Sequence, residues 1–248
     1  MTYTVACNER LRVGCAVFVT PLHNPIQLAK GLATLDQLSR GRLDIGIGTG
    51  GPHRPFAAFG VEPDSYVARF REGLELMKAC WTEPTIDFDG RFWQVAGGAM
   101  KLKPFQKPHP PIWFGGSHPA ALRRAVRHGD AFMGAGSTTT AAFADQVNVV
   151  RAELQDAGRA TFPIAKRVYI RVDDDAEQAR LTMASDLERL YGDFGRGLRP
   201  VAVCGTPDDC IKGLAAVVAA GAEMIVLNPL DDEFAQLTRL ATAVLPHV

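Results

Sequence analysis

The chain has 248 residues, 47% of them hydrophobic, and its 27 lysines and arginines balance its 27 aspartates and glutamates. A chain of this length buries on the order of 70 to 75% of its unfolded surface when it folds as one α/β domain, so we expect a single domain over residues 1–248. The zero net charge argues against a nucleic-acid or anionic-membrane partner, and the absence of an export pattern or of an apolar run near the ~20 residues of a membrane span indicates a cytoplasmic protein.

The first predicted unit is a strand, a helix and a second strand. A nearly unbroken apolar run predicts a buried parallel strand at Val13–Val19. Asn24, which is followed by proline, supplies the N-cap of a helix that runs to about Ser39. The periodicity places the leucines of this helix against the sheet and Asp36 in water, and Gly41 closes the helix as a left-handed cap.

Large and small side chains alternate in the second strand of this unit. The bulky residues are Leu43, Ile45 and Ile47, and the residues that follow each of them are Asp44, Gly46 and Gly48. One face of this strand therefore carries bulk, and the other face leaves room for another group. Three prolines between residues 52 and 63 then forbid a helix until about Ser65 and predict an irregular loop over the strand end.

The chain next leaves the α/β alternation and returns to it. A helix is expected at Ser65–Trp81, and an excursion at about residues 82–110 contains a hairpin with a two-residue Asp89-Gly90 turn. The elements expected after it are strands at Ile112–Phe114, Ala131–Met133, Ile164–Val172 and Met224–Leu227, and helices at 119–128, 139–157, 176–191, 207–220 and 234–245, with a glycine-rich link at 192–200. Six strands in α/β alternation leave two candidate folds, a doubly wound sheet and a (β/α) barrel.

A formal GxGxxG motif at Gly46–Gly51 bears on that choice. A dinucleotide-binding fold requires a helix at the third glycine and an acidic residue at a strand end about 20 positions later. The prolines block that helix, and no such acidic residue follows. The pattern therefore favours the barrel, in which the turns GTGG, FGGS and MGAG collect at one end of the strands.

The turn at Gly115–Pro119 carries the clearest binding chemistry. Two glycines there lead from a strand into a helix that begins with proline, which exposes backbone amides and the positive end of the helix dipole to an anion such as a phosphate. Gly134–Gly136, after the next strand, would complete such a cradle. The alternative is that both segments are ordinary short turns, because glycine is frequent in turns.

Other reactive side chains are few. The five cysteines are odd in number and show neither CxxC nor histidine-paired metal spacing, so we expect reduced, mostly buried thiols and no metal site. A phosphate-binding aldolase or isomerase barrel would need a lysine or a pair of carboxylates at strand ends, and the sequence indicates neither. These classes of site are therefore not favoured.

Four segments of the chain resemble the bacterial luciferase-like flavin monooxygenase superfamily. They read LAKGLATLDQLSRGRLDIGIGTGG, RFREGLELMKACWTEPTIDFDGRFW, KPHPPIWFGGSHPAALRRAVRHGDAF and GTPDDCIKGLAAVVAAGAEMIVL. The resemblance covers nearly the whole chain and implies a TIM-type (β/α)8 barrel that uses FMN or the 5-deazaflavin coenzyme F420. Within the superfamily the chain is more similar to F420-dependent oxidoreductases than to luciferases. The resemblance thus implies hydride transfer between F420 and an organic substrate, with an FMN-dependent monooxygenase that uses reduced flavin and oxygen as the alternative.

The resemblance also assigns cofactor-binding residues. The peptide bond between Ala16 and Val17 aligns with a strand end where hydride-transferring members place a bulge and a non-proline cis peptide behind the deazaflavin ring; the alternative is a regular buried strand. Thr49 and Gly50 align with the next strand end lining the cofactor. The residues that match the side holding the phosphate are Gly115, Gly116, Ser117, Gly134 and Ala135.

The chain departs from the family pattern because the first two βα units of the barrel are absent. Those units usually supply the acidic or histidine residue near the reactive ring carbon, so the resemblance assigns no catalytic acid or base. His23, His53 and His118 lie on loops near the predicted site, where a solvated histidine is the commoner case. Arg54 is a candidate to attract an acidic substrate or cofactor tail, and a solvated loop arginine is the alternative.

An incomplete barrel would expose two apolar strand edges, which folded proteins normally cover. We expect either a reading frame that starts late or is a fragment, or a homodimer or rearranged N-terminal segment that covers the edges. A truncated chain could also bind a cofactor weakly or act only as an interaction partner.

Overall fold

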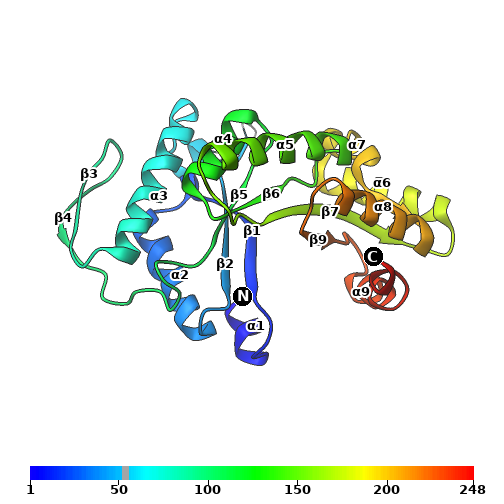
Figure 1. Ribbon diagram of the computed structural model, residues 1–248, viewed down its shortest axis with the longest axis horizontal. Helices are drawn as coiled ribbons and strands as arrows, with labels where there is room; N and C mark the ends of the chain where they lie inside the picture. Colours follow the sequence, from blue (N-terminus) through cyan, green and yellow to red (C-terminus); the bar gives the residue numbers. More distant parts are fainter. Residues whose placement is uncertain (52–55) are drawn as a thin grey trace. The chain divides into compact units, whose positions relative to one another are not determined.

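A computed structural model describes residues 1–51 and 56–248. The chain divides into two compact units, Met1–Gly115 and Gly116–Val248. Helices and strands alternate in both units, as the sequence predicts (Figure 1). Among the described residues, no helix is both long and apolar enough to cross a membrane.

The first unit contains a three-stranded parallel sheet and a separate hairpin. Its elements are α1 (Thr2–Cys7), β1 (Val13–Val19), α2 (Pro25–Ser39), β2 (Leu43–Gly48), α3 (Tyr66–Thr82), β3 (Ile86–Asp89), β4 (Gln94–Gly98) and β5 (Ile112–Gly115), with 3-10 turns at Thr20–Leu22, Phe56–Phe59 and Pro63–Ser65. β2 is the central strand, because it pairs in parallel with both β1 and β5. The predicted strand–helix–strand unit and the helix after the proline-rich loop are therefore confirmed.

The bulky face of β2 forms the core of the first unit. Its residues Leu43, Ile45 and Ile47 are fully buried. Phe70 of α3 meets Phe114 of β5 edge to face, with ring centroids 5.6 Å apart. Trp81 of α3 donates its indole N–H to the carbonyl of Ala29 in α2 at 3.0 Å. These contacts join α2 and α3 to each other and α3 to the sheet.

Helix α2 begins as predicted but ends differently. The Asn24 side chain accepts hydrogen bonds from the backbone N–H groups of Ile26 and Gln27. The prediction that Gly41 is the left-handed cap is wrong, because Arg40 is the C-cap, with φ of 53°, and Gly41 follows with φ of 81°. Their N–H groups bond to carbonyls of the last helical turn at 3.0 Å each, so two consecutive residues with positive φ close the helix.

Arg40→Gly is expected to raise the free energy of unfolding of the first unit by up to about 1 kcal/mol. A left-handed conformation costs a residue with a Cβ atom roughly 1 to 2 kcal/mol, part of which is offset by the larger conformational entropy of unfolded glycine. Urea unfolding followed by tryptophan fluorescence measures the effect, since all three tryptophans, Trp81, Trp93 and Trp113, lie in this unit. A lower midpoint for the variant would contradict the assignment of the cap.

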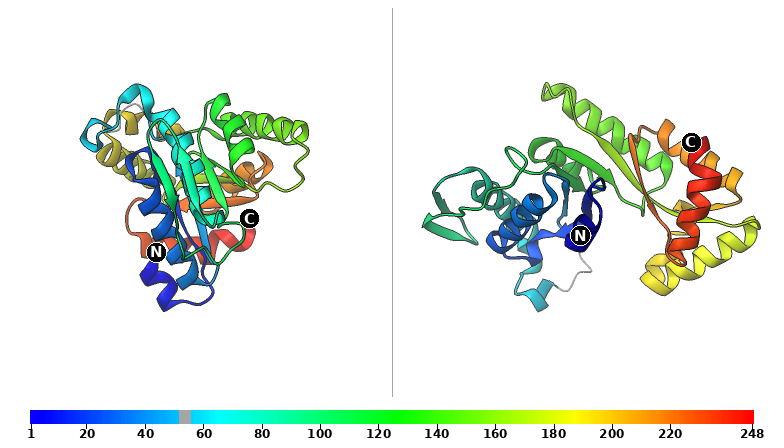
Figure 2. Two further views of the ribbon diagram at one scale, coloured as in Figure 1. Left: turned by 90° about the vertical axis from the view of Figure 1, so that its left-hand side faces the viewer. Right: turned by 90° about the horizontal axis from the view of Figure 1, so that it is seen from below.

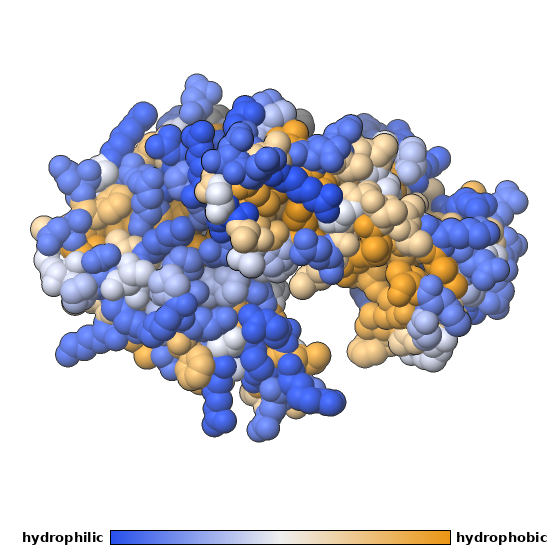
Figure 3. Space-filling model, in the orientation of Figure 1, coloured by the Kyte–Doolittle hydropathy of each residue, from blue (hydrophilic) through white to orange (hydrophobic). Residues whose placement is uncertain are grey.

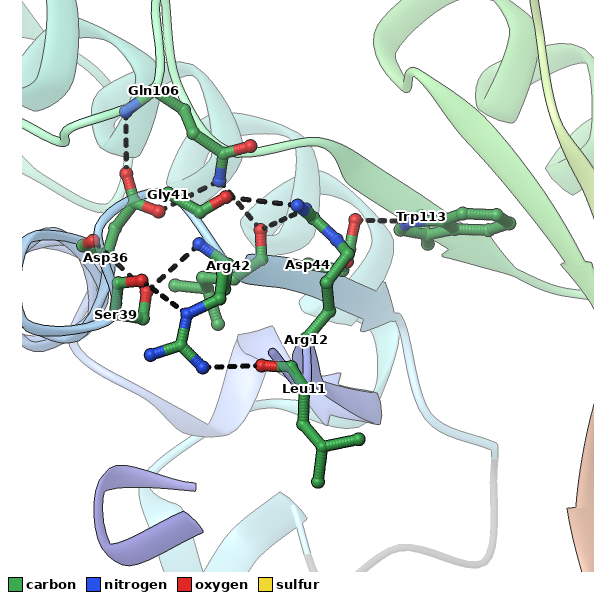
Figure 4. Close-up of polar contacts among 10 residues, drawn as sticks. Leu11, Arg12, Asp36, Ser39, Gly41, Arg42, Asp44, Gln106 and Trp113 are labelled. Carbon is green, nitrogen blue, oxygen red and sulfur yellow. Dashed lines mark hydrogen bonds and ion pairs between the residues drawn. The ribbon is translucent and has the colours of Figure 1, made fainter. Parts of the chain in front are cut away.

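Asp36 of α2 is fully buried, which corrects the prediction that it faces water. Its carboxylate accepts hydrogen bonds from the backbone N–H and the side-chain amide of Gln106, both at 2.8 Å (Figure 4). A carboxylate without such donors would be costly to bury. Asp36 thus anchors the segment that returns the chain to β5, a contact 70 residues away along the chain.

Asp44 links the three strands near their amino ends. Its carboxylate accepts from Arg12 Nε at 2.8 Å and from the indole N–H of Trp113 at 3.2 Å (Figure 4). The neighbouring Arg42 donates to the carbonyl of Leu11 at 2.7 Å. This polar network occupies the amino ends of the strands, opposite the carboxyl ends where the glycine-rich turns lie.

The hairpin β3–β4 lies at the periphery of the first unit (Figures 1 and 2). Its connection is longer than the predicted two-residue turn, because β3 ends at Asp89 and β4 begins at Gln94. The carboxylate of Glu72 in α3 accepts hydrogen bonds from the backbone N–H groups of residues 91–93 at 2.7 to 3.0 Å. A side chain distant in sequence therefore stabilises the longer loop.

The second unit is built around the long strand β7. Its elements are α4 (Pro119–His128), β6 (Ala131–Gly134), α5 (Thr140–Asp156), β7 (Ile164–Val172), α6 (Ala176–Tyr191), α7 (Asp193–Arg196), β8 (Val203–Gly205), α8 (Pro207–Ala219), β9 (Met224–Asn228) and α9 (Glu233–Arg239), with a π-helical turn at Leu240–Val244 and 3-10 turns at Arg199–Val201 and Leu245–His247. β7 pairs in parallel with β6, β8 and β9. The π-helical turn interrupts the single helix predicted at Phe234–Leu245.

The short strand β8 is an addition, because the sequence predicts no element between the link at 192–200 and the helix that starts at Thr206-Pro207. Val203–Gly205 pairs with Ile170–Val172 at the end of β7. Three residues are too few to produce a periodic signal in the sequence. With β8, the described part of the chain contains seven strands in the α/β alternation instead of six.

Strands β1 and β9 each pair with a single strand among the described residues, β1 with β2 and β9 with β7. Apolar side chains also gather on the second unit near its C-terminus (Figure 3). Phe234 and Leu237 of α9 are 88% and 51% exposed. The second unit therefore presents both exposed apolar side chains and a strand, β9, with one edge unpaired among the described residues, and the homodimer expected from the sequence stays a prediction.

Candidate functional site

The first cluster of predicted site residues lies toward the carboxyl end of β1. The bond between Ala16 and Val17 is a non-proline cis peptide, and the register of β1 against β2 shifts between Cys15 and Phe18. The bulge and the cis bond that the resemblance implies are both confirmed. Ala16 is exposed and Val17 is half-buried, so this bend is accessible from outside the first unit.

Three glycines surround the side chain of Val17. A Cβ atom added to Gly46 or Gly115 would lie 3.4 Å from Val17 Cγ1, and one added to Gly48 would lie 2.9 Å from Val17 Cγ2. The small face of β2 therefore accommodates Val17 of the neighbouring strand. A Cβ atom at Gly48 would therefore press on Val17, whereas one at Gly46 or Gly115 would be in ordinary van der Waals contact with it.

Thr49 and Gly50 follow β2 directly. The Thr49 hydroxyl donates to the carbonyl of Gly50 at 3.1 Å, and Gly50 has φ of 75°, a conformation that glycine adopts at no steric cost. Both residues are half-buried. Because β1, β2 and β5 run parallel, these residues lie at the same edge of the first unit's sheet as Gly115 and the bend at Ala16.

The second cluster begins with Gly116 and Ser117, which lead into α4 in the second unit. His118 is the N-cap: its Nδ1 accepts a hydrogen bond from the N–H of Ala120 at 3.2 Å, and its carbonyl accepts from the N–H of Ala121 at 2.7 Å. The first donors of α4 are thus already satisfied. Within the described residues, the backbone N–H groups of Ser117 and His118 have no acceptor, so these are the donors that this turn offers to an anion.

The turn Gly134–Thr138 follows β6 and contains the other predicted phosphate residues, Gly134 and Ala135. Lys166 of β7 reaches this turn: its Nζ donates to the carbonyls of Ala135 at 2.8 Å and Thr138 at 2.9 Å, and to the Thr138 hydroxyl at 3.2 Å. Lys166 is only 3% exposed. Burial, and then the charge of Arg167, lower the pKa of Lys166 to about 8, so its ammonium stays mostly charged at pH 7.

Arg167 reaches the same turn from the opposite face of β7, because successive side chains of a strand alternate between faces. A Cβ atom added to Gly136 would lie 2.9 Å from Arg167 Nε. That Nε is buried and has no acceptor within the described residues. The guanidinium lies over the ring of Tyr169, 5.0 Å from its centroid, and donates to the Tyr169 hydroxyl at 2.6 Å.

Tyr169 connects Arg167 to α6. Its hydroxyl donates to the hydroxyl of Tyr191 at 3.2 Å. Burial, and then this hydrogen bond with Tyr191, raise the pKa of Tyr169 to about 12. Tyr169 therefore remains neutral at physiological pH and brings no negative charge to Arg167.

Sequence reasoning missed Lys166 and Arg167. The strand reads IAKRVYIRV, so two adjacent basic residues interrupt an otherwise apolar run. Charged residues are rarely buried unless a partner holds them. That interruption was the available signal, but the acceptors for Lys166 lie 28 and 31 residues upstream and could not be identified from spacing.

The predicted loop histidines find structural roles where they are described. His118 caps α4, and the His23 ring contacts Phe18 edge to face, with centroids 6.1 Å apart. His53 and Arg54 lie outside the described residues. Within the ranges that are described, no group of histidine, cysteine, aspartate and glutamate residues is arranged to hold a metal ion.

The five cysteines are free thiols, as expected, but the prediction that most are buried is wrong. Cys80 and Cys210 are buried, Cys15 and Cys204 are half-buried, and Cys7 is exposed. None of the five is among the residues predicted to bind a cofactor.

These features define a class of protein, a TIM-type α/β fold with glycine-rich turns at the carboxyl ends of its strands. The coenzyme F420-dependent tetrahydromethanopterin reductase from Methanopyrus kandleri shares the α/β fold of the chain. Its structure superposes with a TM-score of 0.79 at 18% identity, over 99% of the present chain and 86% of that chain. At this identity the likeness shows the fold alone.

The chain belongs to the luciferase-like monooxygenase family, whose model matches residues 1–224. The FMNH2-dependent dimethylsulfone monooxygenase of Pseudomonas putida is 33% identical over 183 residues, which are 73% of this chain and 50% of that enzyme. The crystal structure of the monooxygenase RslO1 from Streptomyces bottropensis gives a TM-score of 0.86 at 26% identity, over 99% of this chain and 81% of that one. The present chain thus matches about half the length of its curated relative.

Proposed function

We propose that the chain provides the flavin-type cofactor site of an oxidoreductase that transfers a hydride between coenzyme F420 and an organic substrate. The family match over residues 1–224 is the observation that carries this proposal. The sequence resemblance to F420-dependent oxidoreductases supports the choice of cofactor. When bound, the cofactor supplies the redox chemistry, and the chain binds and orients it.

The residues present fit such a group. We assign the ring to Ala16, Val17, Thr49 and Gly50, and the phosphate to Gly115, Gly116, Ser117, Gly134 and Ala135. The first set offers small side chains and accessible backbone beside a bend in β1. The second set offers backbone donors at Ser117 and His118 and the positive charge of Lys166 beneath the Gly134–Thr138 turn. Backbone amides near fixed positive charge favour a phosphate.

An FMN-dependent monooxygenase is the second candidate, and the 33% identity to the FMNH2-dependent dimethylsulfone monooxygenase favours it. FMN and F420 share a tricyclic ring and a phosphate, so the same residues would hold either one. In this case the chain would exclude water from the ring and position the organic substrate against it, while reduced flavin and oxygen supply the chemistry.

Titration of the purified chain with F420 and with FMN, followed by fluorescence quenching, distinguishes the candidates. Quenching of F420 alone supports hydride transfer, and quenching of FMN alone supports the monooxygenase. Binding of neither contradicts the proposal and favours a chain that acts as an interaction partner.

Ser117→Asp is expected to weaken binding of the cofactor whose fluorescence the chain quenches by tenfold or more, because the substitution places a negative charge beside the assigned phosphate position. Ser185→Asp makes the same chemical change at another exposed serine, on α6, and is expected to leave the affinity within about twofold of the unmodified chain. Equal effects of the two substitutions would remove Ser117 from the site.

A further inference from the structure

The turn Gly134–Thr138 stands beside two cations that lack a negative partner. None of the ion pairs among the described residues includes Lys166 or Arg167. Tyr169 stays neutral, so it does not balance Arg167. Burying a cation without a counter-charge is costly, which makes an anionic ligand the natural complement of this pair.

Lys166 and Arg167 differ in what they can do for a ligand. All three N–H groups of the Lys166 ammonium are directed at oxygens of Ala135 and Thr138, so Lys166 fixes the turn and contributes charge without reaching a ligand. Arg167 has five N–H donors and uses one of them on Tyr169 among the described residues. Its unused donors remain available to an oxyanion.

The turn itself supplies further donors. The backbone N–H groups of Gly136 and Ser137 have no acceptor in the part of the chain that the structure describes. Gly136 packs directly against Arg167 Nε, since an added Cβ atom would lie 2.9 Å from it. The absence of a side chain at Gly136 thus brings the backbone donors and the guanidinium to one place.

We propose that Gly136, Ser137 and Arg167 form an oxyanion subsite, in which Arg167 contacts the anion and Lys166 is a positioning residue that holds the turn. The identification of this anion as the phosphate of the bound cofactor rests on the proposed function. The subsite itself takes a phosphate or a similar oxyanion from any source. Arg167 therefore adds to the second cluster a side chain whose positive charge attracts an anion, beside the backbone N–H donors of Gly136 and Ser137.

Paired titrations test the subsite. The first titration compares the cofactor whose fluorescence is quenched by the chain with its phosphate-free counterpart, which is riboflavin for FMN and the phosphate-free deazaflavin for F420. In the second, inorganic phosphate is titrated by calorimetry. The variants are Arg167→Gln and Lys166→Met, and Arg171→Gln is the matched control, because Arg171 lies on the same strand and faces Asp186 at 3.9 Å. Circular dichroism confirms that each variant is folded.

Arg167→Gln is expected to weaken binding of the phosphorylated cofactor by tenfold or more and to change the affinity for its phosphate-free counterpart by no more than about twofold. Arg171→Gln is expected to change neither affinity. Lys166→Met is expected to give a smaller loss of affinity with the same selectivity.

Loss of inorganic phosphate binding in Arg167→Gln with unchanged cofactor affinity supports the subsite and assigns it to a different oxyanion. Phosphate binding that depends on Arg167 in a chain that binds neither cofactor supports the subsite and overturns the proposed function. Unchanged affinities for cofactor and phosphate in Arg167→Gln overturn the subsite.

Discussion

Gly46→Ala is expected to lower the free energy of unfolding of the first unit by about 3 kcal/mol or more. A Cβ atom added to Gly46 would overlap the backbone carbonyl oxygen of Cys15 in β1. Backbone atoms cannot move aside as a side chain can, and β2 is held in register by strands on both sides. Relief therefore requires β1 to separate from β2, which also displaces Val17. Urea unfolding followed by tryptophan fluorescence measures the loss.

Gly31→Ala is the control for this substitution. Gly31 is an exposed position of α2, and an added Cβ atom there has no neighbouring atom within 4 Å. Alanine is favoured over glycine inside a helix, so Gly31→Ala is expected to raise the free energy of unfolding by about 0.5 to 1 kcal/mol. If Gly46→Ala also left the unfolding midpoint unchanged or raised it, the close approach of β1 to β2 would be wrong.

Gly46 also illustrates what the sequence pattern of β2 predicts and what it does not. The alternation of large and small residues in β2 correctly predicts a buried face and an open one. It does not identify what fills the open face, because the occupant, Val17, comes from a neighbouring strand with an irregular register. The capping residue Asn24 was predictable for the opposite reason, since its partners lie within three residues along the chain.

Elements that depend on distant partners were missed or misplaced. Asp36 was predicted to face water because the helical period places it opposite the leucines, and its buried partner Gln106 lies 70 residues away. The hairpin loop is longer than its Asp-Gly signal indicates, because Glu72 of α3 binds its backbone N–H groups. Helix propensity and turn preference are local quantities, so neither could report these contacts.

The residues of the candidate site also differ in whether the sequence predicts them. Its glycines and the bend at Ala16 were predictable, the first from local turn chemistry and the second from the family resemblance. The basic pair Lys166 and Arg167 was not, because its significance depends on carbonyl groups of the turn after β6 and on a tyrosine two residues further along β7. Charge inside an apolar strand is a visible anomaly, but its partners are set by tertiary structure.

Lys166→Met is expected to reveal the buried ammonium as a pH dependence of stability. The pKa of Lys166 is lowered from 10.5 to about 8 in the folded chain, so between these values the unfolded chain binds a proton that the folded chain does not. Stability rises with pH wherever the unfolded state binds more protons. The free energy of unfolding of the unmodified chain minus that of the variant is therefore expected to be flat below pH 8 and to rise from pH 8 to 10.5 by up to about 1.4 kcal/mol per pH unit.

The difference in free energy of unfolding between the unmodified chain and Lys166→Met is the informative quantity, because the absolute stability of both chains is expected to fall at high pH. Burial raises the pKa of Cys204 to about 12 and that of Cys210 to about 11, so the folded chain holds these protons longer than the unfolded one. Because both chains contain these cysteines, the stability that they lose at high pH cancels in the difference.

The groups packed against Lys166 simplify the interpretation. The neighbouring turn and α5 present Ala135, Thr138 and the ring of Phe143, none of which titrates, and Arg167 is the charged neighbour on its own strand. Urea unfolding followed by circular dichroism at pH 7, 8, 9 and 10 measures both chains. A difference that stays constant across this range would mean that the pKa of Lys166 is not lowered in the folded chain, which contradicts the burial of its ammonium.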